Sequence, residues 1–173
     1  MLRRGHGNGI LRIVSHPTLG LPPRSLQSGF PDAAARLRAG RAALGVRALE
    51  IALDGDPTIR ERYDELGLRT LLRDTEVLVE CLADCVAGND AHWLKEFADQ
   101  SAIMYRRRRV PMDDVIRLTE GLRSAVRGLL NADELTVADT ALDEAVKVYR
   151  WYRRLGGDAR KRNRILAAIY KGA

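Results

Sequence analysis

The hydrophobic positions of this chain recur at helical intervals from residue 33 onwards. One series follows at intervals of seven, four and four: Leu71, Leu78, Leu82 and Val86. A second series has intervals of three and four: Val115, Leu118, Leu122, Val126 and Leu129. Such intervals place apolar side chains on one face of an α-helix. Because no segment carries a convincing strand or hairpin pattern, the sequence predicts an all-α fold.

Helix-starting and helix-ending residues divide this pattern into about six or seven helices. A first apolar stretch covers residues 33–53. Asp56-Pro57 is typical of a helix start, with the aspartate as the capping residue and the proline in the first turn, and Gly67 predicts the end of that helix. The next helix is expected over about residues 70–87, with Gly88 ending it.

The following two helices are separated by a proline. Asn89 or Asp90 is expected to cap the first of them, which ends near Arg109, because the residue before a proline avoids the α region. Pro111 then opens the second helix, and two aspartates in its first turn suit the positive end of the helix dipole.

The last long helix is expected over about residues 136–155. Its predicted buried positions are Val137, Ala141, Ala145, Val148 and Tyr152. Gly156-Gly157 is expected to break it, and Asp158 to cap a terminal helix that carries three apolar residues: Ile165, Leu166 and Ile169.

Charge and composition change along the chain. Residues 1–30 are rich in glycine, so we expect a flexible N-terminal extension before one helical domain at residues 31–173. The net charge of +6 consists of +4 in residues 1–30, −6 in residues 31–146 and +8 in residues 147–173. The acidic middle argues against nucleic-acid binding by the whole domain, whereas the basic C-terminal helix suits an anionic partner.

Several functional classes find no support in the sequence. No apolar run approaches the roughly 18 residues of a membrane span. There is no phosphate-binding glycine loop and no nucleophile, base and acid set, and only three histidines are present, so we expect no enzyme. Two cysteines within one predicted helix are poorly placed for a local disulfide, which indicates a cytoplasmic protein.

Residues 56–130 carry a resemblance to phycobiliprotein subunits, which hold a linear tetrapyrrole. The resembling elements are Arg73-Asp74, the turn Ala87-Gly88-Asn89-Asp90, Tyr105 and Val110-Pro111. The resemblance implies that Asp74 contacts pyrrole nitrogens and Arg73 a propionate of a bilin-type tetrapyrrole. The family's thioether cysteine would fall at Leu71, so the resemblance implies non-covalent binding.

The same region resembles the non-haem globin-like sensor domains of bacterial stress-signalling proteins. The shared features are Asp74, the helix at residues 90–109 and the Val-Pro helix start. Haem-binding relatives need a histidine late in that helix, where this chain has Tyr105 and four arginines, so no haem is expected. The resemblance implies globin-like packing, which the mixed apolar intervals also suit, with a simple up-down bundle as the alternative.

The candidate ligand contacts are Arg73, Asp74, Trp93, Phe97, Tyr105, Arg106 and Arg109. Each also has a simpler structural explanation. Adjacent residues of a helix, such as Arg73 and Asp74, point about 100° apart and suit ordinary surface ion pairs. The stripe of Trp93, Phe97 and Met104 suits a hydrophobic core as well as a pocket wall. The arginines suit either a propionate or phosphate clamp, or the negative end of a helix dipole.

Cys81, Cys85 and His92 are the only hint of a metal site. Two thiolates and an imidazole bind zinc, but no fourth ligand is evident, and small apolar packing explains the cysteines more simply. A redox role would need exposure and a lowered thiol pKa.

The C-terminal segment supplies candidates for binding a partner: Arg150, Trp151, Arg153 and Arg154. The interleaved aromatic and basic side chains suit an amphipathic helix, and also suit single-stranded nucleic acid. The sequence therefore predicts a non-enzymatic sensor or regulatory domain acting through a homodimer or a signalling protein. A non-covalent tetrapyrrole binder is the first alternative, and an anionic-surface or nucleic-acid binder the second.

Overall fold

The computed structural model describes the backbone of residues 29–162 and the side chains of residues 29–155. This part of the chain forms seven α-helices and no strand: α1 (Pro31–Ala39), α2 (Arg41–Gly55), α3 (Thr58–Arg62), α4 (Glu65–Gly88), α5 (His92–Arg107), α6 (Met112–Val126) and α7 (Ala132–Arg162). The all-α prediction is therefore confirmed for these residues. The predicted extension falls mostly on residues 1–28, and the three apolar residues of the predicted terminal helix on residues 163–173, which are both outside the described residues. Asp158, which was expected to cap that helix, lies inside α7.

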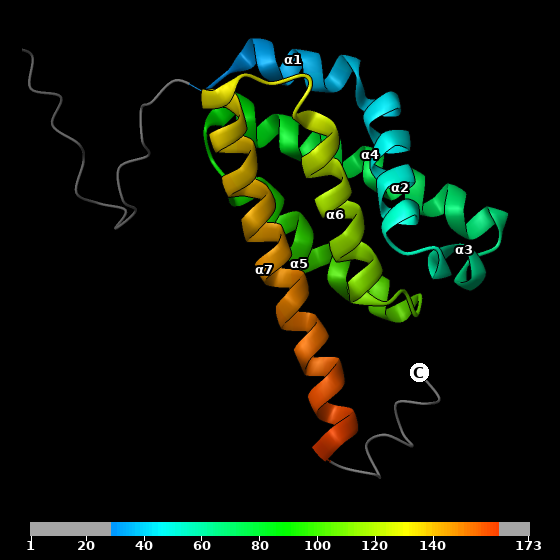
Figure 1. The fold of residues 1–173 in the computed structure, drawn as a ribbon. Coiled ribbons are helices and arrows are strands. Elements are labelled where there is room, and N and C mark those ends of the chain that lie inside the picture. Colours follow the sequence, from blue (N-terminus) through cyan, green and yellow to red (C-terminus); the bar gives the residue numbers. More distant parts are fainter. Residues whose placement is uncertain (1–28, 163–173) are drawn as a thin grey trace, which may run out of the picture.

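The helices pack around α4, which contacts α1, α2, α5, α6 and α7. The helix α6 packs between α2 and α7, and α5 packs against α7 and α4 (Figure 1). The core is filled by fully buried side chains from six of the helices: Leu37, Leu82, Leu94, Leu122, Leu142, Tyr149 and Ile59 among the largest. The C-terminal part of α7 extends past the ends of its neighbours (Figure 1).

A glycine allows the closest crossing of two helices. A Cβ atom on Gly121 of α6 would lie 2.4 Å from the backbone oxygen of Ala48 on α2. No such contact is tolerated, so α6 approaches α2 this closely only because residue 121 lacks a side chain.

The predicted boundaries in the first half need correction. The first apolar stretch is split at Gly40 into α1 and α2. Gly67 does not end a helix: it lies in the first turn of α4, where its amide donates to the capping side chain of Asp64 at 2.7 Å. The residue that ends α4 in the left-handed conformation is Asn89, with φ of 48°, and not Gly88. An asparagine replaces glycine here because it tolerates this conformation better than other side chains.

The predicted boundaries of the last helix are also wrong at both ends. It begins at Ala132, where Asn131 accepts from the amides of Asp133 and Glu134, and Glu134 accepts from the amide of Asn131 in return. This reciprocal cap fixes the start ahead of residue 136. Gly156-Gly157 lies inside α7. Glycine weakens a helix by about 1 kcal/mol relative to alanine, which is a cost that a long helix tolerates.

Within residues 29–162, no helix combines the length and the hydrophobicity needed to cross a bilayer.

Candidate functional site

Helices α4, α5, α6 and α7 meet around a small recess. Its walls are Asp74, Thr75, Leu78, Phe97, Tyr105, Val115, Leu118, Thr119 and Tyr149. Three of the seven candidate ligand residues are brought together here: Asp74, Phe97 and Tyr105. The buried threonines were not predicted, because each lies within an apolar stripe and the only signal was a polar residue at a buried helical position.

The hydroxyl groups around the recess already have partners. Thr75 donates to the backbone oxygen of Leu71 at 2.8 Å, and Thr119 donates to that of Val115 at 2.9 Å. The hydroxyls of Tyr149 and Ser101 are hydrogen-bonded at 2.9 Å. Among the described residues, no buried side-chain nitrogen or oxygen lacks a partner. The polar lining is therefore satisfied by the protein itself.

Asp74 stands at the edge of the recess and pairs with Arg108. The guanidinium Nη1 of Arg108 donates to Asp74 Oδ2 at 2.9 Å and its carbon lies 5.7 Å from the centre of the Tyr105 ring. This ion pair joins the end of α5 to the middle of α4. Burial raises the pKa of Tyr105, so its side chain is a neutral phenol at pH 7. Nothing in a run of four arginines marks Arg108 as the inward one, which is why the sequence analysis missed it.

The predicted aromatic stripe of α5 is not a core stripe. Trp93 and Met104 are 54% and 51% exposed, and only Phe97 is partly buried against the core. The buried face is made of smaller residues together with one tyrosine: Leu94, Ala98, Ser101, Ala102 and Tyr105. Since α5 packs on α7, whose own buried face holds Ala138, Ala141 and Ala145, small side chains suit a close approach of the two helices. The large side chains are left on the surface.

The remaining candidate arginines do not reach the recess. Arg73, Arg106 and Arg109 are exposed, and none forms an ion pair with another described residue. Arg109 has φ of 60°, and the amide of Val110 donates to the backbone oxygen of Tyr105 at 2.9 Å. Arg109 therefore occupies the left-handed position that ends a helix, where glycine is usual.

The recess is small for a cofactor. Its cavity volume is about 10 Å³, which is room for about one water molecule. Pockets for drug-sized ligands span roughly 300–1,000 Å³. A bilin-type tetrapyrrole would therefore require α4, α5 and α6 to separate, and its binding stays a prediction.

The two cysteines are embedded in helix packing. Burial is the largest cause that raises the pKa of Cys81 to about 11 and that of Cys85 to about 12. Cys85 Sγ accepts a hydrogen bond from the amide of Leu94 at 3.3 Å, which joins α4 to α5. The described residues contain no group of three potential metal ligands, so the zinc alternative gains no support.

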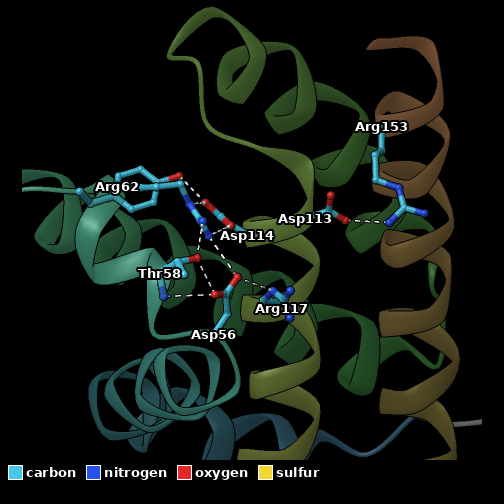
Figure 2. A network of polar contacts seen from close by, with 8 residues as sticks. Asp56, Thr58, Arg62, Asp113, Asp114, Arg117 and Arg153 are labelled. Atoms are coloured by element: carbon cyan, nitrogen blue, oxygen red, sulfur yellow. Dashed lines mark hydrogen bonds and ion pairs between the residues drawn. The ribbon is translucent and has the colours of Figure 1, made fainter. Parts of the chain in front are cut away.

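A second polar cluster ties α3 to the start of α6. Asp114 accepts from Arg62 Nη2 at 2.7 Å and from the hydroxyl of Tyr63 at 2.8 Å. Figure 2 shows Arg62 between Asp114 and Asp56, with Arg117 also reaching Asp56. The hydrogen bond with Asp114 is the main cause that raises the pKa of Arg62. The cluster is internally paired, so its arrangement is that of a structural link.

The candidate partner residues lie on the exposed C-terminal part of α7. Trp151 and Leu155 are 49% and 41% exposed, and the Trp151 ring contacts Tyr152 edge-on with centroids 4.8 Å apart. Arg153 pairs with Asp113 at 2.7 Å (Figure 2). Arg150 and Arg154 are exposed and pair with no other described residue.

The Asp113–Arg153 ion pair also places two basic segments at one end of the bundle. Asp113 follows the turn that contains Arg109, so residues 106–109 lie at the same end as Arg150 and Arg154. The ring of Tyr105 on α5 lies 6.4 Å from that of Tyr149 on α7, which agrees with this alignment.

A comparison with known protein families and a comparison with curated proteins both find no match to this chain.

Proposed function

We propose that this chain is a non-enzymatic regulatory domain that acts, without haem, through protein–protein contacts made by α7. The observation that carries the proposal is the exposed face of α7, where Trp151 and Leu155 lie near Arg150 and Arg154, which pair with no other described residue. Tryptophan and arginine are the residues that most often dominate binding energy at protein interfaces. A helix that extends past its bundle can present such a face to a partner (Figure 1).

The recess supports a structural role for the bundle. Its hydroxyl groups have protein partners and its volume is below the usual range for ligand pockets. The Asp74–Arg108 pair then serves to fasten α5 to α4.

The sequence resemblance supports a regulatory role. The three helices on which it rests correspond to α4, α5 and α6, and the Val110-Pro111 step precedes α6 as the resemblance implies. Globin-like packing is part of this proposal.

Two exposed tryptophans offer a matched test. A photo-reactive phenylalanine analogue is placed at Trp151 in one chain and at Trp93 in another, and each chain is irradiated in cells of its source. The two sites have similar exposure on different helices, so position 93 controls for exposure. Because the proposed partner binds α7, we expect a specific adduct from position 151 and none from position 93. Absence of an adduct at 151, or equal adducts at both positions, would contradict the proposal.

A further inference from the structure

We infer that the partner of α7 is a second copy of this chain, and that the two α7 helices pair antiparallel. This inference rests on the proposed function, since it names the partner of the same helix face. It follows from the charge, the exposed apolar positions and the symmetry of α7.

The charge of α7 changes sign at its middle. Residues 132–146 contain five acidic residues and no basic one, whereas residues 147–162 contain seven basic residues and one acidic one. Two such helices in parallel would place like charge beside like charge. In the antiparallel arrangement each acidic half lies along a basic half, which favours association and fixes the orientation.

Intramolecular pairs neutralise the acidic half only in part, although Glu134 pairs with Arg36 and Glu144 with Lys147. Asp139 and Asp143 of α7 both pair with Arg123 of α6, at 2.9 and 2.6 Å, and Glu120 pairs with the same guanidinium. Three carboxylates therefore share one positive charge. The side chains of Asp139 and Asp143 remain 40% and 60% exposed, so surplus negative charge is available to a second molecule.

The basic half also carries positive charge that is not paired within the described residues. Arg150 and Arg154 pair with no other described residue, and Arg153 shares its charge with the exposed Asp113. The C-terminal part of this half extends past the ends of the neighbouring helices (Figure 1).

A seam of four apolar residues and one glutamate runs along both charged halves of α7. Its members are Val137, Glu144, Val148, Trp151 and Leu155, at intervals of seven, four, three and four. None of the five is fully buried, although Val137 and Val148 pack partly against the core and Glu144 pairs with Lys147. Among the described side chains of α7, Trp151 and Leu155 are the most exposed apolar ones. These intervals are those of the seam between two paired helices.

Four of the five seam residues are symmetric about a point at residue 146, whereas the counterpart of Trp151 is Ala141, which is buried. A twofold axis at that point pairs Val137 with Leu155 and Glu144 with Val148 of the other copy. It also brings Asp139 near Arg153. The paired segment, residues 137–155, is about 27 Å long at 1.5 Å per residue. One surface then serves both copies, as closed twofold dimers require.

Engineered cysteines test the orientation. Val137→Cys and Leu155→Cys chains, with tags of different size, are oxidised separately and as a mixture. Antiparallel pairing predicts a disulfide between the two variants in the mixture and little within either variant alone. Cys81 and Cys85 stay in place, because their raised thiol pKa values slow oxidation, and the unsubstituted chain measures their contribution. Disulfides between two Leu155→Cys chains, with none that joins the two variants in the mixture, would overturn the antiparallel arrangement.

Charge reversal tests the complementarity. Arg150→Glu/Arg154→Glu lowers the net charge of residues 147–162 from +6 to +2, and Asp139→Lys/Asp143→Lys changes that of residues 132–146 from −5 to −1. We expect each variant alone to dimerise about tenfold more weakly or worse, and their mixture to form a heterodimer. Circular dichroism confirms that each is folded. If the variants dimerise as the unchanged chain does, the inference fails.

The two proposals fail in different ways. A chain that stays monomeric at every concentration, yet forms an adduct with another protein from position 151, would overturn the antiparallel dimer and leave the proposed function standing. A chain without any adduct at position 151 would overturn both.

Discussion

Asp113 and Asp114 are neighbours in the first turn of α6, yet their side chains have opposite surroundings. The side chain of Asp113 is 57% exposed and meets only Arg153, whereas that of Asp114 is 2% exposed and binds both Arg62 and Tyr63. Both are recognisable from the sequence as helix-start residues. The buried role of Asp114 is not, because its partners lie more than 50 positions away in the sequence.

This contrast predicts very different effects of one substitution at two adjacent sites. Asp114→Asn leaves Arg62 without its buried partner and should lower the free energy of unfolding by about 2–3 kcal/mol. Asp113→Asn removes an exposed pair and should cost less than about 0.5 kcal/mol. Urea unfolding of both variants measures the difference. Equal losses would show that Asp114 is not the link between α3 and α6.

Arg109 is the residue whose backbone is least suited to its side chain. A non-glycine residue in the left-handed region costs roughly 1 kcal/mol. Arg109→Gly should therefore raise the free energy of unfolding by up to about 1 kcal/mol, whereas Arg107→Gly, at the last residue of α5, should lower it by less than about 1 kcal/mol. Thermal unfolding of the two variants measures the difference. A loss of stability in Arg109→Gly would contradict this prediction, because it would mean that the Arg109 side chain stabilises the fold.

At the scale of helices, the sequence predicted which segments are helical better than which face they bury. The series Leu71, Leu78, Leu82 and Val86 is buried as predicted, because large aliphatic residues there fill the centre of the bundle. On α5 the same reasoning failed. The close approach to α7 selects alanine and serine, and periodicity of large residues does not reveal a face built from small ones.

Gly121 sets the distance between α2 and α6. Because a Cβ there would meet the backbone oxygen of Ala48, Gly121→Ala should push the helices apart and destabilise the protein by about 1–3 kcal/mol. Gly128→Ala is the matched control, since a Cβ at that position meets nothing within 4 Å. Chemical unfolding compares them. If both substitutions have the same effect, the close crossing does not constrain residue 121.

The cap at the start of α7 predicts a pH dependence. The amide of Asn131, and then Arg36 at 2.6 Å, hold the pKa of Glu134 below its ordinary value of 4.5. A carboxylate with a lowered pKa in the folded state stabilises the protein above the unfolded pKa, and this contribution is lost as the pH falls through the lower folded value. Glu134→Gln should therefore be less stable than the unchanged chain at pH 7, with a gap that narrows below pH 4.5. A gap that stays constant from pH 7 to pH 3 would contradict this assignment.

At the scale of the molecule, the folded helices bring together what the sequence presents as two separate sets of residues. The basic run at residues 106–109 and the basic part of α7 meet at one end of the bundle, as the Asp113–Arg153 pair shows. Asp74, Phe97 and Tyr105 meet at the recess, while Arg73 and Trp93 lie outside it. Which arginine turns inward depends on the left-handed turn at Arg109, and no local sequence pattern encodes this choice.

The antiparallel pairing of two α7 helices would explain the uneven charge of the chain. The sign change at the middle of α7 gives each molecule a surface that is complementary to itself when rotated by half a turn. Association of this kind weakens with salt, because exposed charge pairs are screened over about 8–10 Å at physiological ionic strength.

The most direct test of association through α7 is sedimentation equilibrium of the unchanged chain, Trp151→Ala and Trp93→Ala. The two variants remove the same side chain from sites of similar exposure on different helices. We predict a dimer for the unchanged chain and for Trp93→Ala, and a shift towards monomer for Trp151→Ala. A dimer that is insensitive to Trp151→Ala, or weakened equally by both substitutions, would contradict the assignment of α7 as the interaction surface.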